Sequence, residues 1–439
     1  MRARQARPRL LQAMLDAFSL PDLRRRILIT FGILIVFRFV AHVPLPGVNL
    51  DALSSLFERN ALLGMLDMFS GGAMRRFSVA AMGVYPYITA SIVMTLLVPI
   101  IPQLQALSQE GESGRDKINR ITHWLTVPLA GLEGYGQLIY LQHEGVLTNA
   151  AALPMATMVI SLIAGTMFLV WLGERITEYG IGNGISIIIF GGIVAGYWQT
   201  AGQVFITGEQ QLVGAAVYIL IALATVVVIV IFTEAHRRVP VQYSRSVFRG
   251  GRMYRQAGST HIPLRVNTAG MIPLIFAMSL VMFPGVVASY FMNPSGAEPN
   301  MANHIYNLFS SNASLPLGLF YWGLYFLLTV GFAFFYTMVI FEQQDLPATL
   351  QRQGGFIPGI RPGAHTKTYL NGVINKITWA GALFLAVVAI MPFIAQQLTG
   401  VKGIQLSSMG MLIVVGVVLD TMKQMEAQLV MRRYEGFIK

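Results

Sequence analysis

The chain has 439 residues, of which 54% are hydrophobic and only 12% are charged. Soluble domains carry about 25% charged residues, so this composition excludes an ordinary soluble protein and indicates a chain that crosses a membrane many times. The formal net charge is +11, and the absence of cysteine excludes disulfide bonds and cysteine-based redox or metal chemistry.

Apolar stretches of about 20 residues predict ten transmembrane helices and an all-α integral membrane protein. They lie near 24–43, 78–99, 121–142, 154–173, 184–205, 212–233, 268–292, 316–341, 373–395 and 404–423. An even number of spans puts both termini on the same side. The spans form two sets of five, which is the pattern of an inverted repeat.

The distribution of lysine and arginine predicts the orientation. Most of the 31 Lys and Arg residues fall in the terminal segments and in the connections on the same side as the termini. The opposite side holds Arg59, Arg75, Arg76 and Lys402, and Arg38 lies within the first span. By the positive-inside rule, both termini are cytoplasmic.

Three parts are expected along the chain. Residues 1–233 hold the N-terminal half, together with the start of the sixth span at about 212, which opens the second half. A long cytoplasmic loop covers 234–267. The rest of the C-terminal half, 268–439, contains a second cytoplasmic loop at 342–372 and a cytoplasmic tail.

The chain lacks the motifs of an enzyme or a nucleotide-driven pump. No Lys follows a Gly, so a phosphate-binding P-loop cannot be built, and no HExxH pair occurs. Glu133, in the third span, is a helix–helix hydrogen-bond partner, a groove-lining residue or a proton relay. The Arg38 side chain either extends to the membrane–water interface or pairs with a group inside the protein. We predict no catalytic site, metal or cofactor.

Residues 66–94 (LDMFSGGAMRRFSVAAMGVYPYITASIVM) form an apolar stretch that is interrupted three times. The interruptions are Gly71–Gly72, Arg75–Arg76 and the corner at Gly83–Pro86. One interpretation is a loop with an interfacial helix, and the other is a half-helix that re-enters the protein. Non-helical backbone at membrane depth is tolerated only where it faces protein or water.

Two cytoplasmic loops are candidates for binding. The 234–267 loop is basic, with Tyr243, Phe248 and Tyr254 interleaved, and residues 352–363 form a tip stiffened by Gly and Pro. Such surfaces suit anionic lipid, RNA or an acidic protein. Two extended tips favour a large docking partner.

Several ordered motifs closely resemble the SecY family of protein-translocation channels. They are LPDLRRRI, HVPLPGV, the stretch from MFSGGAM to TASI, EGESGR (110–115), GIGNGISIIIF (180–190), STHIPLRVN (259–267) and GGFIPGIRPG (354–363). The resemblance implies ten helices in two pseudo-symmetric inverted halves around a central hourglass pore. The pore passes unfolded secretory chains and releases apolar segments sideways into lipid.

The resemblance also implies partners and a location. Energy comes from a SecA-type motor ATPase or the ribosome, which agrees with the missing nucleotide motif. The other partners that the resemblance implies are small membrane subunits of the SecE and SecG type, the secretory preprotein and membrane lipids. The expected location is the plasma membrane, which is the inner membrane in bacteria that have two.

Site residues carried over from the resemblance fall into four groups. A plug helix at about 62–76 includes Leu66, Met68, Phe69, Ser70, Gly71 and Gly72. The pore ring is Ile88, Ile92, Ile185, Ile189, Ile275 and Ile413. Thr89, Ser91 and Thr95 weaken a lateral gate between the second and third spans and the seventh and eighth. The residues expected to dock a partner are Arg245, Arg249, Arg252 and Arg361, although Ser246 stands where the family usually has a basic residue.

The runner-up function is an ion-coupled secondary transporter with inverted repeats, and a third is a lipid-embedded scaffold.

Overall fold

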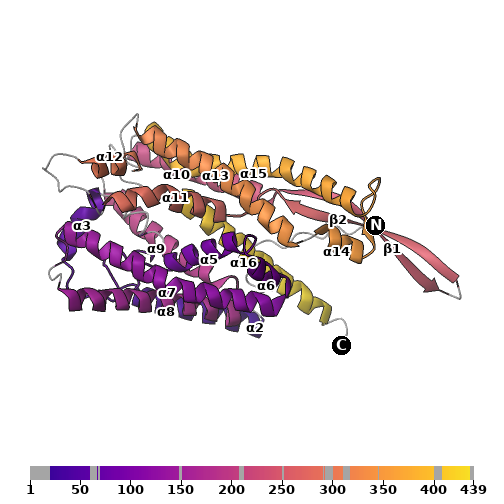
Figure 1. Ribbon diagram of the computed structural model, residues 1–439, viewed down its shortest axis with the longest axis horizontal. Coiled ribbons are helices and arrows are strands. Elements are labelled where there is room, and N and C mark those ends of the chain that lie inside the picture. The colour runs from indigo at the N-terminus through magenta and orange to yellow at the C-terminus, as the bar shows by residue number, and fades with distance from the viewer. Residues whose placement is uncertain are drawn as a thin grey trace.

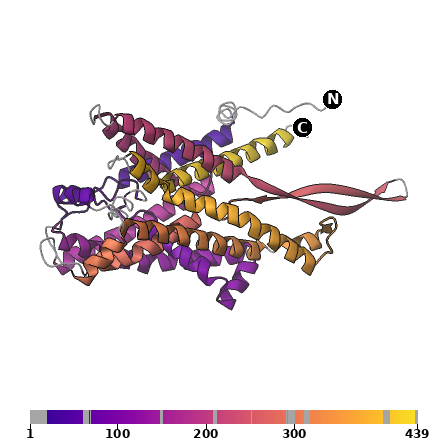
Figure 2. The same ribbon diagram turned by 90° about the horizontal axis from the view of Figure 1, so that it is seen from above.

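A computed structural model describes residues 20–59, 67, 70–147, 151–206, 212–249, 252–289, 291, 300–309, 317–344, 346–399 and 408–435. The molecule is an elongated bundle of helices with a long β-hairpin at one end (Figures 1 and 2). Two short helices, α3 (Leu50–Arg59) and α12 (Met301–Leu308), lie at the other end. The first lies in the connection between the first and second expected spans, and the second lies in the connection between the seventh and eighth.

Each expected span contains one helix. These are α2 (Pro21–Val40), α5 (Tyr85–Leu97), α7 (Glu112–His143), α8 (Ala152–Tyr179), α9 (Gly184–Ile206), α10 (Leu212–Glu234), α11 (Ile272–Ser289), α13 (Leu317–Gln344), α15 (Ala364–Thr399) and α16 (Ser408–Glu435). Within the described residues, α8, α15 and a stretch that includes α13 are long and apolar enough to cross a membrane. A fourth span results if α5 and α6 (Pro102–Gln109), bent by 99°, count together. Ten crossings therefore stay a prediction.

The helices pack in an order that occurs twice. In the first set, α5 packs on α7, α7 on α8 and α8 on α9, while α2 contacts both α8 and α9. In the second set, α11 packs on α13, α13 on α15 and α15 on α16, while α10 contacts both α15 and α16. The two sets meet where α9 packs against α16. The same arrangement of five helices is thus built from two stretches of chain.

The largest hydrophobic core is shared by both sets. It contains Phe37, Ile193, Ile275, Tyr321 and Ile413, each at most 5% exposed. The outer faces are apolar as well. Exposed side chains on α2 and α10 include Leu28, Phe31, Ile35, Phe39, Ile219, Leu220, Leu223 and Val227. A soluble protein would not leave such continuous apolar surface in water, whereas a bilayer covers it.

The second expected span, 78–99, is only partly helical. Helix α5 begins at Tyr85, with Pro86 in its first turn, and the preceding residues 73–84 are largely buried turns. Their backbone is paired with the end of the first span: the Leu45 N–H donates to the Phe77 carbonyl and the Val79 N–H to the Val43 carbonyl. The expected helix was wrong here because apolar composition does not report the positive φ of 42° at Phe77 and 58° at Gly83.

The 234–267 loop is a β-hairpin, so the all-α expectation was wrong for this part. Strand β1 (His236–Arg249) pairs antiparallel with β2 (Arg252–Arg265), and β1 also pairs with β3 (Gly355–Phe356) from the 342–372 loop. Val239 and Val241 are buried on alternate positions of β1, beside Leu350 of α14 (Leu346–Arg352). The alternation at 239–241 (VPV) is too short to predict a strand, and the residues around it are mostly basic or polar.

Candidate functional site

Six isoleucines from four helices lie in or against one apolar core, here called the isoleucine cluster. Ile189 of α9, Ile275 of α11 and Ile413 of α16 are buried within it. Ile88 and Ile92 of α5 and Ile185 of α9 are partly buried and pack against the same core. All six residues predicted for the pore ring therefore belong to, or pack against, the one core that both sets of helices share.

This cluster is chemically suited to exclude water and ions. Branched apolar side chains offer no hydrogen bond to a hydrated ion, and an apolar constriction closes by losing its water. Ala73, Ala80 and Val84, from the non-helical segment before α5, belong to the same core. The segment that precedes α5 is thus packed on the cluster.

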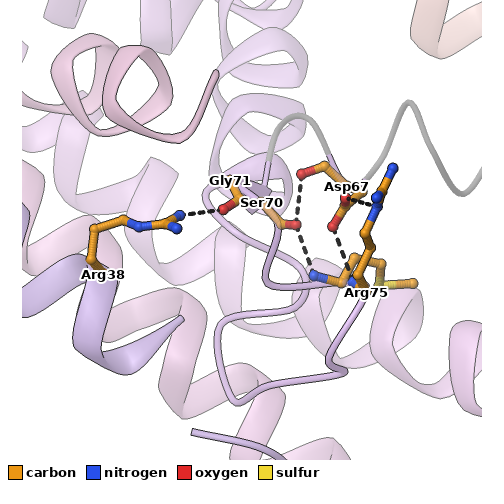
Figure 3. A network of polar contacts seen from close by, with 6 residues as sticks. Arg38, Asp67, Ser70, Gly71 and Arg75 are labelled. Atoms are coloured by element: carbon orange, nitrogen blue, oxygen red, sulfur yellow. Dashed lines mark hydrogen bonds and ion pairs between the residues drawn. The ribbon is translucent and has the colours of Figure 1, made fainter. Parts of the chain in front are cut away.

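A compact polar turn precedes that segment and is here called the foot turn, defined as Asp67 together with residues 70–75 (Figure 3). The Asp67 carboxylate accepts from the Arg75 N–H at 3.0 Å and lies 3.0 Å from the Arg75 Nε. The Ser70 hydroxyl donates to the Asp67 carbonyl and accepts from the Met74 N–H, both at 3.0 Å. These contacts close the turn on itself.

Arg38 of α2 connects the first span to the foot turn. Its Nη1 donates to the Gly71 carbonyl at 2.5 Å, as Figure 3 shows. Gly71 and Gly72 have φ of 69° and 84°, which glycine adopts without the Cβ penalty. The turn predicted from the two adjacent glycines is therefore present, and of the two alternatives for Arg38, the internal partner is realised.

The Asp67 carboxylate is buried although it is charged and paired. Asp67 is 7% exposed, while the Arg75 side chain is 53% exposed. Burial raises the pKa of Asp67, and the Arg75 N–H and guanidinium oppose that increase. Arg75 also lies over the Phe57 ring, 6.0 Å from its centroid, which ties the turn to α3.

Only some of the predicted plug residues are among those that the structure describes. Leu66, Met68 and Phe69 lie outside the described residues, whereas Ser70, Gly71 and Gly72 form part of the foot turn. Sequence reasoning missed Asp67, although a lone acidic residue eight positions before an arginine in an apolar stretch was a usable signal. Arg75 and Arg76 are exposed, as the interpretation of a re-entrant segment requires.

The predicted gate residues lie along α5, half-buried. The Thr89 hydroxyl donates to the Tyr85 carbonyl at 3.2 Å, and the Thr95 hydroxyl donates to the Ser91 carbonyl at 2.8 Å. The two sets of helices are linked at this point by a residue that the sequence did not single out. The Tyr85 hydroxyl on α5 donates to the hydroxyl of Ser279 on α11 at 3.1 Å.

Glu133 of α7 lies beside the same seam. Its carboxylate is close to the Thr89 hydroxyl, and its Oε2 is buried without a hydrogen-bond partner. Gln137 Oε1, one turn further along α7, is also buried and unpaired. The contact with Thr89 joins α7 to α5, as expected for a helix–helix hydrogen-bond partner.

The predicted docking residues lie on the β-hairpin and on the tip at 352–363. Arg245 pairs in register with Gln256, and Arg249 faces Arg252 at the far end of the hairpin. Arg361 is exposed in the connection between β3 and α15, and its carbonyl accepts from the Thr366 hydroxyl at 3.0 Å. Because β3 pairs with β1 at Gln242 and Tyr243, the two tips are joined by backbone hydrogen bonds.

These features define the class: a membrane protein of many helices, with two similarly packed sets around one apolar core and a polar turn seated on it. The SecY family model matches residues 78–422, so the chain belongs to the SecY family. The protein translocase subunit SecY of Thermotoga maritima is 42% identical over 98% of both chains.

Solved structures share the fold at low identity. A structure described as a protein-conducting channel superposes with a TM-score of 0.65 at 15% identity, covering 95% of this chain and 97% of that one. Sec61 from a canine ribosome–channel complex gives 0.62 at 16% identity, with the same coverage. At these identities the likeness shows the fold alone.

Proposed function

We propose that this chain is the channel subunit of a protein translocase, which passes unfolded secretory polypeptides across a membrane and releases transmembrane segments into lipid. It is not an enzyme. The observation that carries the proposal is the isoleucine cluster, which joins both helix sets at one core, with a glycine-based turn packed against it. A relative that is a translocase subunit and matches nearly the whole chain at 42% identity supports it.

The architecture we propose is ten crossings in two inverted halves around an hourglass pore. The repeated packing order supports two equivalent halves, since each helix of one set has a counterpart with the same neighbours in the other. Five is an odd number, so the second half enters the membrane from the opposite side. The hairpin and the end of α16 lie at one end of the bundle, as cytoplasmic termini require (Figure 2).

The pore is sealed by the isoleucine cluster and stoppered from the external side by the plug. An extended polypeptide displaces the apolar side chains and meets no hydrogen-bond donor or acceptor that would hold it. Sideways release uses the seam between the α5–α7 and α11–α13 pairs. The polar side chains of Thr89, Ser91 and Thr95 weaken the apolar packing along this seam. The Tyr85–Ser279 hydrogen bond must break for the seam to open.

The chain needs a partner to supply energy, because it has no nucleotide motif. The basic hairpin and the Arg361 tip, joined through β3, suit a SecA-type ATPase or the ribosome. The solved Sec61 complex contains a ribosome, which supports this part of the proposal. Small subunits of the SecE and SecG type and membrane lipids cover the apolar outer faces in the plasma membrane.

Reconstituted proteoliposomes test the function directly. We expect a secretory precursor to enter the vesicles when a SecA-type ATPase and ATP are supplied, and to stay outside without them. Uptake of a small solute driven by an ion gradient, without precursor transport, would establish the ion-coupled transporter instead. A lipid-embedded scaffold predicts that neither cargo enters.

A further inference from the structure

The foot turn is seated on two helices of the N-terminal set. A Cβ added at Gly71 would lie 2.7 Å from the Cα of Gly192 on α9 and 3.1 Å from the Phe37 ring on α2. The first of these distances is shorter than real Cβ contacts, so the Gly71 backbone lies directly against α9. On the α2 side, Arg38 donates to the Gly71 carbonyl (Figure 3).

Because the foot turn is closed on itself, fixing Gly71 fixes its other residues. Asp67 holds both the N–H and the guanidinium of Arg75, and Ser70 holds the N–H of Met74. Ala73 of this turn, and Ala80 and Val84 further along the chain, belong to the core that contains the isoleucine cluster. The position of the turn is therefore coupled to the packing of the core.

An arginine within a membrane span is costly, so its presence at Arg38 needs a compensating interaction. Here the guanidinium donates to the backbone carbonyl of Gly71. A hydrogen bond from a charged donor is about twice as strong as a neutral one, and it is stronger again away from bulk water. The positive charge of Arg76 repels the Arg38 guanidinium, whereas the carboxylate of Asp67 attracts it.

We propose that Arg38 is a positioning residue for the closed channel: its hydrogen bond to the Gly71 carbonyl, together with the close approach of Gly71 to Gly192, keeps the foot turn seated on α2 and α9. Loss of this anchor lets the turn leave its seat, which loosens the seal to ions without preventing the passage of a polypeptide. This inference rests on the proposed channel function.

The primary test measures resting ion conductance in planar bilayers for Arg38→Gln. The matched control is Arg76→Gln, which removes the same charge from an exposed neighbour of the turn. We expect about a tenfold rise in conductance for Arg38→Gln, because losing a hydrogen bond from a charged donor shifts a two-state population by about that factor. We expect no rise for the control. Equal conductance in the two variants would overturn the proposal.

A second pair of variants addresses the same seat without changing Arg38, in case Arg38→Gln does not accumulate. Gly71→Ala adds a Cβ against the Gly192 backbone, whereas Gly145→Ala adds one at a similar φ of 71° with no atom within 4 Å. The inference requires Gly71→Ala to conduct ions at rest and Gly145→Ala to stay closed. If both variants conduct, backbone strain rather than the seat is responsible, and if both stay closed, the close approach of Gly71 to Gly192 does not hold the turn. Either result overturns the inference.

Precursor translocation is measured on the same preparations, with a SecA-type ATPase added. We expect Arg38→Gln and Gly71→Ala to translocate, because the path for the polypeptide is intact. Failure of the unmodified protein to translocate would contradict the proposed function rather than the positioning role, so the two failures are distinguishable.

Discussion

The isoleucine cluster and the foot turn lie in the same protein and are built by different kinds of interaction. The cluster draws six apolar side chains from four helices, and its packing is non-directional. The foot turn is a single short segment held by a few directed hydrogen bonds and one ion pair. The comparison indicates that the cluster tolerates changes of shape but not of polarity, whereas the turn depends on the position of individual atoms.

The two regions also differ in how they can open. Apolar side chains separate and close again without leaving unpaired groups, so a passing chain can displace them. The foot turn holds buried polar groups, and each one that loses its partner costs about 1–3 kcal/mol. Under the proposed function, we therefore expect the cluster to yield easily and the foot turn to hold until enough force or binding energy is supplied.

The largest effect is expected from making the cluster polar. Ile88→Asn combined with Ile413→Asn places two amides in the apolar core and allows water to remain there. We expect resting ion conductance to rise about a hundredfold. Ile88→Leu combined with Ile413→Leu is the volume-conserving control and should stay closed. An unchanged conductance of the Asn pair would remove these residues from the seal.

A structural test addresses the non-helical segment that separates the two regions. A Cβ at Gly165 of α8 would overlap the carbonyl of Val79, so Gly165→Ala must push this buried backbone away. We expect a loss of about 2 kcal/mol in stability, read as a lower melting temperature in detergent. Gly331→Ala, in α13 with no atom within 4 Å of its Cβ, should be neutral or slightly stabilising. A melting temperature unchanged in both variants would mean that residues 73–84 do not pack as described.

A substitution on the tip at 352–363 should impair docking of the partner without opening the seal to ions. Arg361→Ala removes an exposed charge from this tip and leaves the core intact. We expect ATPase-driven translocation to fall about fivefold, while resting conductance is unchanged. Arg352→Ala, an exposed arginine on the same tip, is the control and should translocate normally. If both variants lose the same activity, the tip acts through its summed charge rather than through Arg361.

The smallest effect concerns the buried carboxylate of the foot turn. Because burial raises the pKa of Asp67, the folded state binds a proton more readily than the unfolded state does. Stability from this group is therefore full below the ordinary aspartate pKa of 3.8 and is lost as pH rises through the raised value. We expect Asp67→Asn, which stays neutral, to match the wild type at acidic pH and to exceed its stability at neutral pH by up to about 1 kcal/mol.

Melting curves at both pH values check this, with the exposed Asp51→Asn as the control. A wild type that is more stable than Asp67→Asn at neutral pH would mean that the ion pair with Arg75 outweighs the cost of burying the carboxylate.

The family resemblance supplied the six isoleucines, which lie in or against one core. Hydropathy and motif order predicted the positions of the ten helices. They did so because apolar length and residue identity determine which segments leave water. The start of α5 was missed because residues 78–84 are apolar yet folded as turns, whose backbone is paired with the Val43–Leu45 segment. The hairpin was missed because its buried valines are few. The anchors at Asp67, Tyr85 and Ser279 depend on contacts across 8 to 194 positions, which a single sequence does not report.

The central claim is that a translocating polypeptide passes through the isoleucine cluster, and disulfide trapping tests it most directly. The chain has no cysteine, so an introduced one is its sole possible partner. A precursor carrying one cysteine is arrested during transport into vesicles that contain either Ile413→Cys, buried in the cluster, or Ile160→Cys, exposed on the outer face of α8. We predict a disulfide-linked product with Ile413→Cys and none with Ile160→Cys. Linkage to Ile160→Cys alone, or to both equally, would contradict a path through the cluster.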